Sequence, residues 1–234
     1  MRHSALPGDA RLHSRPGEPS KQVLRSGLHE LAEPPSSGRG GATRPSEPLL
    51  VVPPSVAPDN PLLIFFHGAG GAASTSLPLV RSAAAEHGCL VLLLTSAAHT
   101  WDVITGGWGS DVDRLDAVLE AVFDHFAVQR FAFGGFSDGA SYALSIGLAN
   151  GDLADTVLAF SPGFAVPPDR IGRPRIWISH GTQDTVLPID RCARPIARTL
   201  RGAGYELNYE EFDGPHVVPP DTVDRALRWW LDQP

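Results

Sequence analysis

The sequence predicts an α/β fold in which a mostly parallel central sheet is flanked by helices. Short continuous apolar runs, such as residues 62–66 and 156–160, have the length and composition of strands that are buried on both faces. Segments with apolar residues at helical spacing alternate with these runs, which is typical of parallel sheets covered on both sides. The length of 234 residues fits one domain with a sizeable core.

The expected elements alternate from residue 47 to the end of the chain. Apolar runs predict strands, and apolar residues at helical spacing predict helices that end at glycines such as Gly88 and Gly202. The expected strands are residues 47–53, 62–66, 89–94, 131–133, 156–160, 175–179 and 207–212, and the expected helices are residues 76–87, 111–126, 140–149, 189–201 and 220–231.

Residues 1–46 differ from the rest because they are rich in Pro, Gly, Ser and Arg. We assign them to an N-terminal segment that precedes the main domain. Weak alternation predicts edge strands at residues 11–15 and 27–31, with a turn between them. The Pro- and Gly-rich residues 34–48 predict a mobile loop.

The composition limits the class of protein. The formal net charge is −7 and no basic stripe is present, which argues against nucleic acid as the main partner. The first residues lack an apolar signal region and the apolar runs are too short to span a bilayer, so we expect a soluble, cytoplasmic protein without a membrane span. Two cysteines, Cys89 and Cys192, do not make a disulfide framework.

A sharp turn is predicted between the strand at residues 131–133 and the helix at residues 140–149. The residues between them include the segment 135–139, G-F-S-D-G, which has the pattern of a serine held at a strained strand-to-helix turn. The two glycines remove side chains that would collide across such a turn. The start of the following helix offers free N–H groups to an oxyanion. Ser137 is therefore the candidate nucleophile; the alternative is an ordinary glycine-rich turn.

Two further polar residues follow later strands. Asp184 lies in the loop after the strand at residues 175–179, and His216 lies in the loop after residues 207–212. Sites in such sheets lie beyond the carboxyl ends of the strands. An imidazole can take the proton of a serine, and a carboxylate fixes the tautomer of that imidazole. The alternatives are a turn-capping Asp184 and a solvated His216, but the order Ser, Asp, His after three strands favours a catalytic triad with Ser137.

A glycine-rich loop follows the first buried strand. Residues 67–71 read H-G-A-G-G and are similar to loops that donate a backbone N–H to an oxyanion hole. We expect the donors to be the N–H of Asp138 and that of Ala69 or Gly70. The alternative is a plain glycine-rich turn. His67 itself is expected to be a structural histidine that orients the loop rather than a base.

The loop after residues 89–94 holds other candidates. Trp101 and Trp108 either line the substrate pocket or cover the core, and the sequence favours neither. Four polar residues could be taken for metal ligands: His99, Asp102, Asp111 and Asp113. Their spacing fits no standard metal site, so we predict none and expect Asp111 and Asp113 to cap the following helix.

Taken together, these motifs resemble the α/β-hydrolase superfamily, nearest to the small serine esterases of the phospholipase/carboxylesterase and dienelactone hydrolase-like group. The matching segments are residues 135–141 (GFSDGAS), 161–163 (SPG), 180–188 (HGTQDTVLP) and 214–216 (GPH). The resemblance covers roughly residues 47–232. It implies an α/β-hydrolase catalytic domain at residues 47–234 and a serine carboxylesterase with the triad Ser137, Asp184 and His216, which needs no cofactor.

The sequence departs from this group at two positions. Asp138 stands where many relatives have glutamine, which puts a carboxylate beside the nucleophile and disfavours anionic substrates. Pro215 stands where glycine is usual and stiffens the histidine loop. Residues 161–174, where caps usually enter such proteins, are too few for a long helical insertion. A minimal or absent cap predicts an open site for small or accessible esters.

Other functions stay open at this point. The same triad serves peptidases, thioesterases and polyester depolymerases, because the shape of the pocket decides which bond is cleaved. A non-catalytic binding protein on this fold is a further alternative, which the intact triad argues against. The expected partner is a small-molecule ester, and the sequence is compatible with a homo-oligomer.

Overall fold

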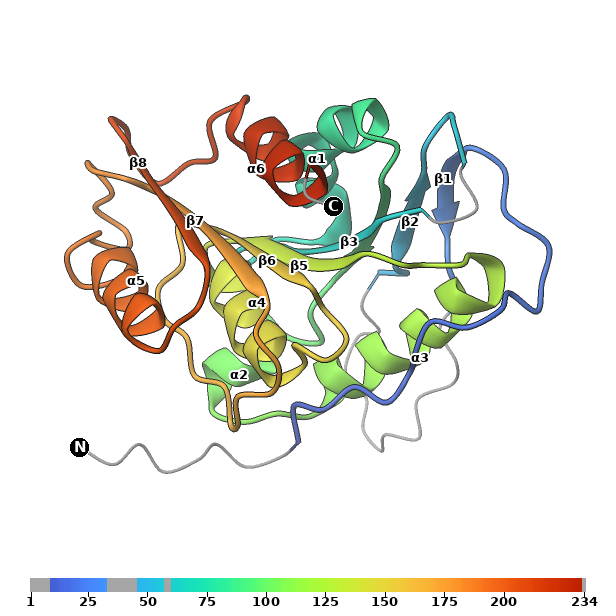
Figure 1. The fold of residues 1–234 in the computed structure, drawn as a ribbon, viewed down its shortest axis with the longest axis horizontal. Helices are drawn as coiled ribbons and strands as arrows, with labels where there is room; N and C mark the ends of the chain where they lie inside the picture. The colour runs from blue at the N-terminus through green and yellow to red at the C-terminus, as the bar shows by residue number, and fades with distance from the viewer. Residues whose placement is uncertain (1–8, 33–45, 57–59, 233–234) are drawn as a thin grey trace.

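The computed structural model describes residues 9–32, 46–56 and 60–232, and these form one α/β structure (Figure 1). The strands are β1 Gly27–Glu30, β2 Leu49–Val52, β3 Leu62–Phe66, β4 Leu90–Leu94, β5 Phe131–Phe136, β6 Thr156–Phe160, β7 Arg175–Gly181 and β8 Leu207–Phe212. The helices are α1 Ala73–Glu86, α2 Asp102–Thr105, α3 Ser110–His125, α4 Asp138–Ala149, α5 Ala193–Gly202 and α6 Thr222–Leu231.

The described strands form a single sheet in the order β1-β2-β4-β3-β5-β6-β7-β8. The six strands from β4 to β8 in this order are parallel, whereas β1 and β2 pair antiparallel at one edge. The register of the central strands is close: Phe66 pairs with Gly135, and Phe136 pairs with Phe160. The carboxyl ends of β3, β5 and β6 therefore meet at one edge of the sheet, where the predicted site residues follow them.

Helices cover both faces of the sheet (Figure 1). Helices α1 and α6 lie on one face, over a core built around residues such as Phe65, Phe160 and Trp230. Helices α2 to α5 lie on the other face, over a larger core that contains residues such as Phe133 and Tyr142. Successive side chains of each strand point to opposite faces and pack into two separate apolar layers. This is why the sequences of these strands are continuous apolar runs.

The expected elements from residue 47 onward are present, with shifts of a few residues at their ends. The largest shift is at α5, which begins at Ala193 rather than at residue 189. The short helix α2 is not predicted, because four residues carry no periodic pattern. The expected edge strand at residues 27–31 corresponds to β1. The expected mobile loop at residues 34–48 lies largely outside the described residues, and its end enters β2 at Leu49.

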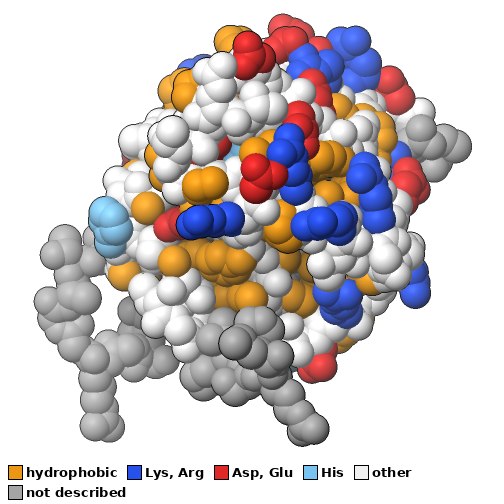
Figure 2. Space-filling view, turned by 90° about the vertical axis from the view of Figure 1, so that its left-hand side faces the viewer, with side chains coloured by type: hydrophobic (Ala, Val, Ile, Leu, Met, Phe, Trp, Pro, Cys, Tyr) orange, Lys and Arg blue, Asp and Glu red, His pale blue; other side chains and the backbone are white. Residues whose placement is uncertain are grey.

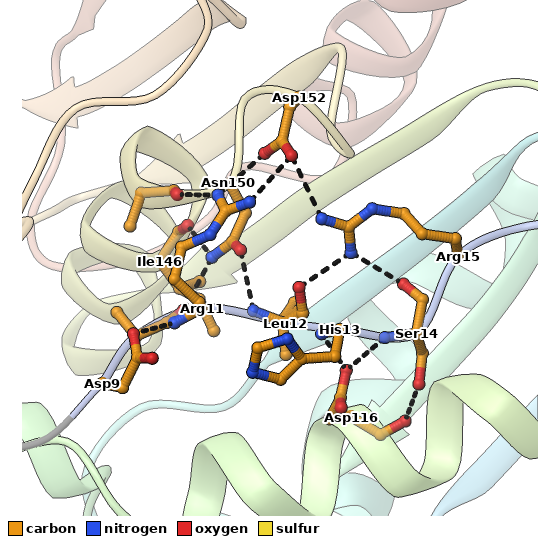
Figure 3. Close-up of polar contacts among 12 residues, drawn as sticks. Asp9, Arg11, Leu12, His13, Ser14, Arg15, Asp116, Ile146, Asn150 and Asp152 are labelled. Carbon is orange, nitrogen blue, oxygen red and sulfur yellow. Dashed lines mark hydrogen bonds and ion pairs between the residues drawn. The ribbon is translucent and has the colours of Figure 1, made fainter.

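The expected edge strand at residues 11–15 is wrong, because this stretch binds helices instead of a strand (Figure 3). The Leu12 N–H donates to Asn150 Oδ1 at 2.9 Å, and Asn150 Nδ2 donates to the Ala10 carbonyl at 2.8 Å. One buried amide therefore mimics the backbone partner that a neighbouring strand would supply. The Leu12 side chain is fully buried in the larger core, so a pattern of alternating burial arises without a sheet.

Residues 9–22 form what we call the N-terminal strap, which runs along α3 and past the end of α4 (Figures 1 and 3). The Arg11 guanidinium makes two hydrogen bonds of 2.8 Å with the Asp152 carboxylate just after α4. Asp116 on α3 accepts the backbone N–H groups of the two residues that follow Leu12, each at 2.8 Å. Farther along, the Lys21 N–H donates to the carbonyl of Asp124 at 2.8 Å. The strap thus joins two helices that cover the same face of the sheet.

Replacing Asn150 by alanine is expected to lower the free energy of unfolding by about 2–4 kcal/mol. The change leaves the Leu12 N–H and the Ala10 carbonyl without their partner in the fully buried surroundings of Asn150. Urea unfolding followed by circular dichroism measures this loss. The control is Arg15→Ala, whose side chain is 40% exposed and whose loss should cost within about 1 kcal/mol. Equal, small losses in both variants would contradict the structural role of the strap.

Candidate active site

Ser137 lies at the turn between β5 and α4, in a conformation that few side chains adopt. Its backbone has φ 59° and ψ −120°, and its N–H donates to the Phe160 carbonyl of β6 at 2.9 Å. The turn is so tight that a Cβ at Gly135 would lie 2.3 Å from the Gly139 carbonyl oxygen. A Cβ at Gly139 would lie 2.1 Å from the Phe66 carbonyl oxygen. Glycine is therefore required at both positions, and the turn holds the serine side chain clear of the sheet.

Two loops bring the predicted base and acid to Ser137. The Ser137 hydroxyl donates to His216 Nε2 at 2.9 Å, and His216 Nδ1 donates to Asp184 Oδ2 at 2.5 Å. Asp184 lies in the loop after β7, and His216 follows β8. The structure thus brings together the three residues predicted as a triad, in the geometry of a nucleophile, a base and an orienting carboxylate.

The Asp184 carboxylate is buried and saturated with hydrogen-bond donors. Although burial alone would raise it, the pKa of Asp184 is lowered, because the Leu187 N–H and the His216 imidazole both donate to this carboxylate. The Val186 and Leu187 N–H groups reach its Oδ1 at 2.9 and 2.8 Å. The group is therefore a fixed negative charge below the imidazole, as its predicted role requires.

A second histidine also contacts this carboxylate, and the sequence did not single it out. His180 Nε2 lies 3.1 Å from Asp184 Oδ2, and the His180 side chain is fully buried. It stands at the end of β7, four residues before Asp184. The only signal in the sequence was the position itself, a histidine at the end of a strand just ahead of the acid loop.

Two backbone N–H groups near Ser137 are free to hold an oxyanion. Among the described residues, neither the Asp138 N–H nor the Ala69 N–H has a hydrogen-bond acceptor. The first opens α4 directly after the nucleophile. The second lies in the loop after β3, which passes so close to Ser137 that a Cβ at Gly68 would come within 3.3 Å of the serine Cβ. This is the placement that an oxyanion hole needs.

The expectation that Gly70 could be an oxyanion donor is corrected by the structure. Its N–H donates to the His99 carbonyl at 2.8 Å, so it is already engaged, and Ala69 is left as the candidate in this loop. His67 has the structural surroundings predicted for it. The Ser96 N–H donates to its Nε2 at 2.9 Å, its Nδ1 donates to the Gly68 carbonyl at 2.6 Å, and burial lowers its pKa.

Trp101 and Trp108 belong to the core and do not line a pocket. Their exposed fractions are 1% and 6%, and both rings pack against Tyr142 of α4. The Trp101 indole N–H donates to the His67 carbonyl at 2.8 Å, which fixes the base of the glycine-rich loop. The tentative pocket assignment for these two residues is therefore wrong, and they support the site from below.

The loop between β4 and α3 is closed by two carboxylates. Asp102 Oδ2 accepts the N–H groups of Gly109 and Asp111 at 2.9 and 3.1 Å, so Asp102 holds the start of α3. Asp111 instead accepts the Ala97 and Asp102 N–H groups at 2.7 and 3.0 Å, which corrects its expected role as a helix cap. Among the described residues, no group of three His, Cys, Asp or Glu side chains could hold a metal ion.

The free energy of unfolding is expected to fall as Asp111 ionises. Burial raises the pKa of Asp111 to about 6, above the value of about 3.9 for an unfolded chain. The folded protein keeps this proton where the unfolded chain has lost it, so the contribution is full below about pH 4 and is lost as the pH rises through about 6.

The test compares the wild type with Asp111→Asn, which cannot titrate, by urea unfolding from about pH 4 to about pH 7. From the lower to the higher pH, the wild type should lose up to about 3 kcal/mol relative to the variant. A difference between the two proteins that stays constant with pH would contradict the raised pKa.

Exposed apolar side chains stand beside the triad. The His216 side chain is 13% exposed, and Val186 and Val217, beside the acid and the base, are 64% and 42% exposed. Residues 161–174, between β6 and β7, contain no helix.

A hollow of about 440 Å³ lies between the strap and α3, and one of about 350 Å³ lies beside α5 and β8; no triad residue lines either. Figure 2 shows the α5 and β8 face, where Lys or Arg side chains surround hydrophobic ones.

No protein-family model and no curated protein matches this sequence. Many solved structures do match. An S-formylglutathione hydrolase (FrmB) from Staphylococcus aureus is 15% identical, covers 90% of this chain and 99% of its own, and has a TM-score of 0.68. Esterase PE8 is 21% identical, covers 78% and 97%, and has a TM-score of 0.62.

The chain has the α/β-hydrolase fold. A truncated carbohydrate esterase from gut microbiota shares it over 94% of this chain and 99% of its own, with 12% identity and a TM-score of 0.67. In this fold, Ser137, Asp184 and His216 stand at the carboxyl ends of parallel strands, where such sheets place their sites. Separately, none of the helices in the described part of the chain is long and apolar enough to span a membrane.

Proposed function

We propose that the protein is a serine carboxylesterase that hydrolyses small or accessible carboxylic esters through an acyl-enzyme. One observation carries the proposal: the Ser137 hydroxyl lies 2.9 Å from His216 Nε2, and His216 Nδ1 lies 2.5 Å from the Asp184 carboxylate. The two unoccupied N–H groups of Ala69 and Asp138 support it, because ester hydrolysis passes through an oxyanion that such donors stabilise.

In the first step, Ser137 Oγ attacks the carbonyl carbon of the ester while His216 Nε2 takes the hydroxyl proton. The carbonyl oxygen becomes an oxyanion and is held by the Ala69 and Asp138 N–H groups. Asp184 stabilises the imidazolium that forms, since its carboxylate accepts from Nδ1. The C–O bond to the alcohol then breaks, and His216 returns the proton to the leaving oxygen.

In the second step, water replaces the alcohol. His216 takes a proton from the water while the water oxygen attacks the acyl-enzyme, and the same two N–H groups hold the second oxyanion. The bond to Ser137 Oγ breaks and the serine recovers its proton from His216. The products are a carboxylic acid and an alcohol, and the chain of steps needs no cofactor.

The absence of a helical cap in residues 161–174 and the charge beside the site support uncharged, accessible esters as substrates. The Asp138 carboxylate lies next to the nucleophile and accepts a hydrogen bond of 2.7 Å from the Thr100 hydroxyl, which fixes its position. A fixed negative charge there repels substrates with an anionic group near the ester. The exposed Val186 and Val217 offer an apolar rim to the acyl or alcohol part.

Thioesters and activated amides are alternatives on the same triad, because the attack on the carbonyl carbon is the same. The matched structures include both esterases and S-formylglutathione hydrolases, so a thioester is the most direct rival. A matched set of an ester, a thioester and an amide with one acetyl group separates these activities. We expect the ratio kcat/KM to be highest for the ester.

The decisive experiment treats the folded protein with a fluorophosphonate and measures the intact mass. The expected result is one adduct, which peptide mapping places on Ser137. No adduct on folded protein would overturn the proposal and favour a non-catalytic binding protein. An adduct on a different serine would also overturn it, since Ser96 and Ser161 follow other strands but their hydroxyls bond to no histidine among the described residues.

A further inference from the structure

The Asp184 carboxylate accepts three hydrogen bonds, and a fourth polar contact comes from a residue outside the triad. Its Oδ1 accepts two backbone N–H groups of its own loop. Its Oδ2 accepts from His216 at 2.5 Å and lies 3.1 Å from His180 Nε2. Two imidazoles therefore meet one carboxylate oxygen.

The surroundings of His180 define its tautomer. Its Nε2 faces two acceptors, the Leu187 carbonyl at 2.8 Å and Asp184 Oδ2 at 3.1 Å, so this nitrogen carries the proton. Its Nδ1 is buried and has no hydrogen-bond partner among the described residues. Burial lowers the pKa of His180, so the ring is a neutral donor at neutral pH.

A second buried polar group without a partner in the described part of the chain directly follows β6, the strand next to β7. The Ser161 hydroxyl is buried and unbonded among the described residues, and its backbone has φ 53°. Phe160 pairs with Ser179 in the sheet, and the Ser161 N–H donates to the Ser179 carbonyl at 2.8 Å. Ser161 and His180 are the residues that directly follow this pair on the two strands. The Ser161 hydroxyl and His180 Nδ1 are thus two buried polar atoms without a partner among the residues that the structure describes, each just beyond that pair on neighbouring strands.

We propose that His180 is a positioning residue for the acid of the triad: its Nε2–H holds Asp184 Oδ2 toward His216 and shares the negative charge of that oxygen. The proposal rests on the proposed serine hydrolase function. His180 stands at the end of β7, and Asp184 lies in the loop that follows. The His180 ring also connects this loop to the sheet, because its Nε2–H donates to the Leu187 carbonyl. Because His180 shares the negative charge, the carboxylate attracts a protonated His216 less strongly. His216 therefore stays neutral more easily and can accept the serine proton.

Other titratable groups lie near this assembly and must stay unchanged in the test. Burial and the charge of Asp184 raise the pKa of the Cys192 thiol at the start of α5, and Glu211 on β8 lies near His180. Asp138 on α4 stands directly after Ser137. None of these three residues is altered in the variants below, so a change in pH dependence reports on His180.

The experiment compares the wild type with His180→Phe and His180→Gln, using p-nitrophenyl acetate at a series of pH values. In His180→Phe the donor is lost, and the acidic limb of the kcat/KM profile should move to higher pH by roughly one unit. At neutral pH, kcat/KM should fall roughly ten- to a hundred-fold. Glutamine can place an N–H near the position of Nε2, so His180→Gln should restore most of the rate and of the profile. His29→Gln is the matched control and should behave as wild type, because His29 lies on β1, at the opposite edge of the sheet from β7 and β8.

A folded His180→Phe variant with the wild-type acidic limb would overturn the proposal, even if its rate were lower. If that variant does not fold, NMR of the wild-type histidine rings decides the question. The ring of His180 should stay a neutral Nε2–H tautomer while His216 titrates, and a Nδ1–H tautomer would overturn the proposal. The NMR result does not depend on turnover, so it stays informative if no serine reacts with fluorophosphonate, which would be the failure of the proposed function instead.

Discussion

Replacing Ser137 by alanine is expected to abolish ester hydrolysis, with a loss in kcat on the order of 10⁴- to 10⁶-fold. The change removes the Oγ that lies 2.9 Å from His216 Nε2, and no other hydroxyl in the described part of the chain bonds to that nitrogen. The fold should be unaffected, because Ser137 ties the turn to β6 through its backbone N–H, which alanine retains. Turnover of p-nitrophenyl acetate measures the loss, and thermal unfolding checks the fold.

Ser96→Ala is the matched control for this variant. Ser96 also follows a parallel strand, β4, but its hydroxyl donates to the Ala98 carbonyl at 2.7 Å and not to a histidine. Its activity should stay within a few-fold of wild type. Near-normal hydrolysis by Ser137→Ala would show that the bond is cleaved by another group, and equal losses in both variants would point to damage to the fold.

Replacing Gly139 by alanine is expected to lower the free energy of unfolding by more than about 4 kcal/mol, or to prevent folding. The added Cβ would lie 2.1 Å from the Phe66 carbonyl oxygen and 2.5 Å from that of His67. These atoms belong to the backbone at the end of β3, which cannot turn aside as a side chain could. This clash is relieved only if α4 moves away from β3, and that movement would also displace Ser137 from His216.

The amount of soluble, folded protein and its urea unfolding curve measure this effect. Gly202→Ala provides the matched control, because a Cβ at the end of α5 meets no atom within 4 Å. That variant should be as stable as wild type or more stable by up to about 1 kcal/mol, since alanine favours helices over glycine. If Gly139→Ala were as stable as Gly202→Ala, the turn would have to be looser than the structure shows.

Much of the fold could be predicted because the parallel strands are buried on both faces. A strand such as β3 has no solvent-facing positions, so its five residues are all apolar and the run ends where the sheet ends. The site residues were predictable for a related reason. A nucleophile at a tight turn requires glycines at fixed offsets, and these leave a local pattern around Ser137.

The parts that were not predicted depend on contacts between distant residues. Residues 11–15 alternate in burial because Leu12 enters the core and Asn150 binds its backbone, and no local pattern separates this from an edge strand. Trp101 is equally ambiguous in sequence, since a large ring after a strand can face a pocket or the core. The contact of His180 with Asp184 could not be seen because it depends on how the acid loop folds back over β7.

The N-terminal strap has a consequence for the order in which the chain is made. Its partner Asn150 is 138 residues away in sequence, so the strap leaves the ribosome long before α4 does and must wait for its docking site. Contacts of such long separation close late and slow folding. The helix face that the strap covers is therefore exposed on the nascent chain until residues near Asp152 emerge. A protein whose strap is shortened would stay in that unfinished state after synthesis, exposing the apolar surface that Leu12 buries.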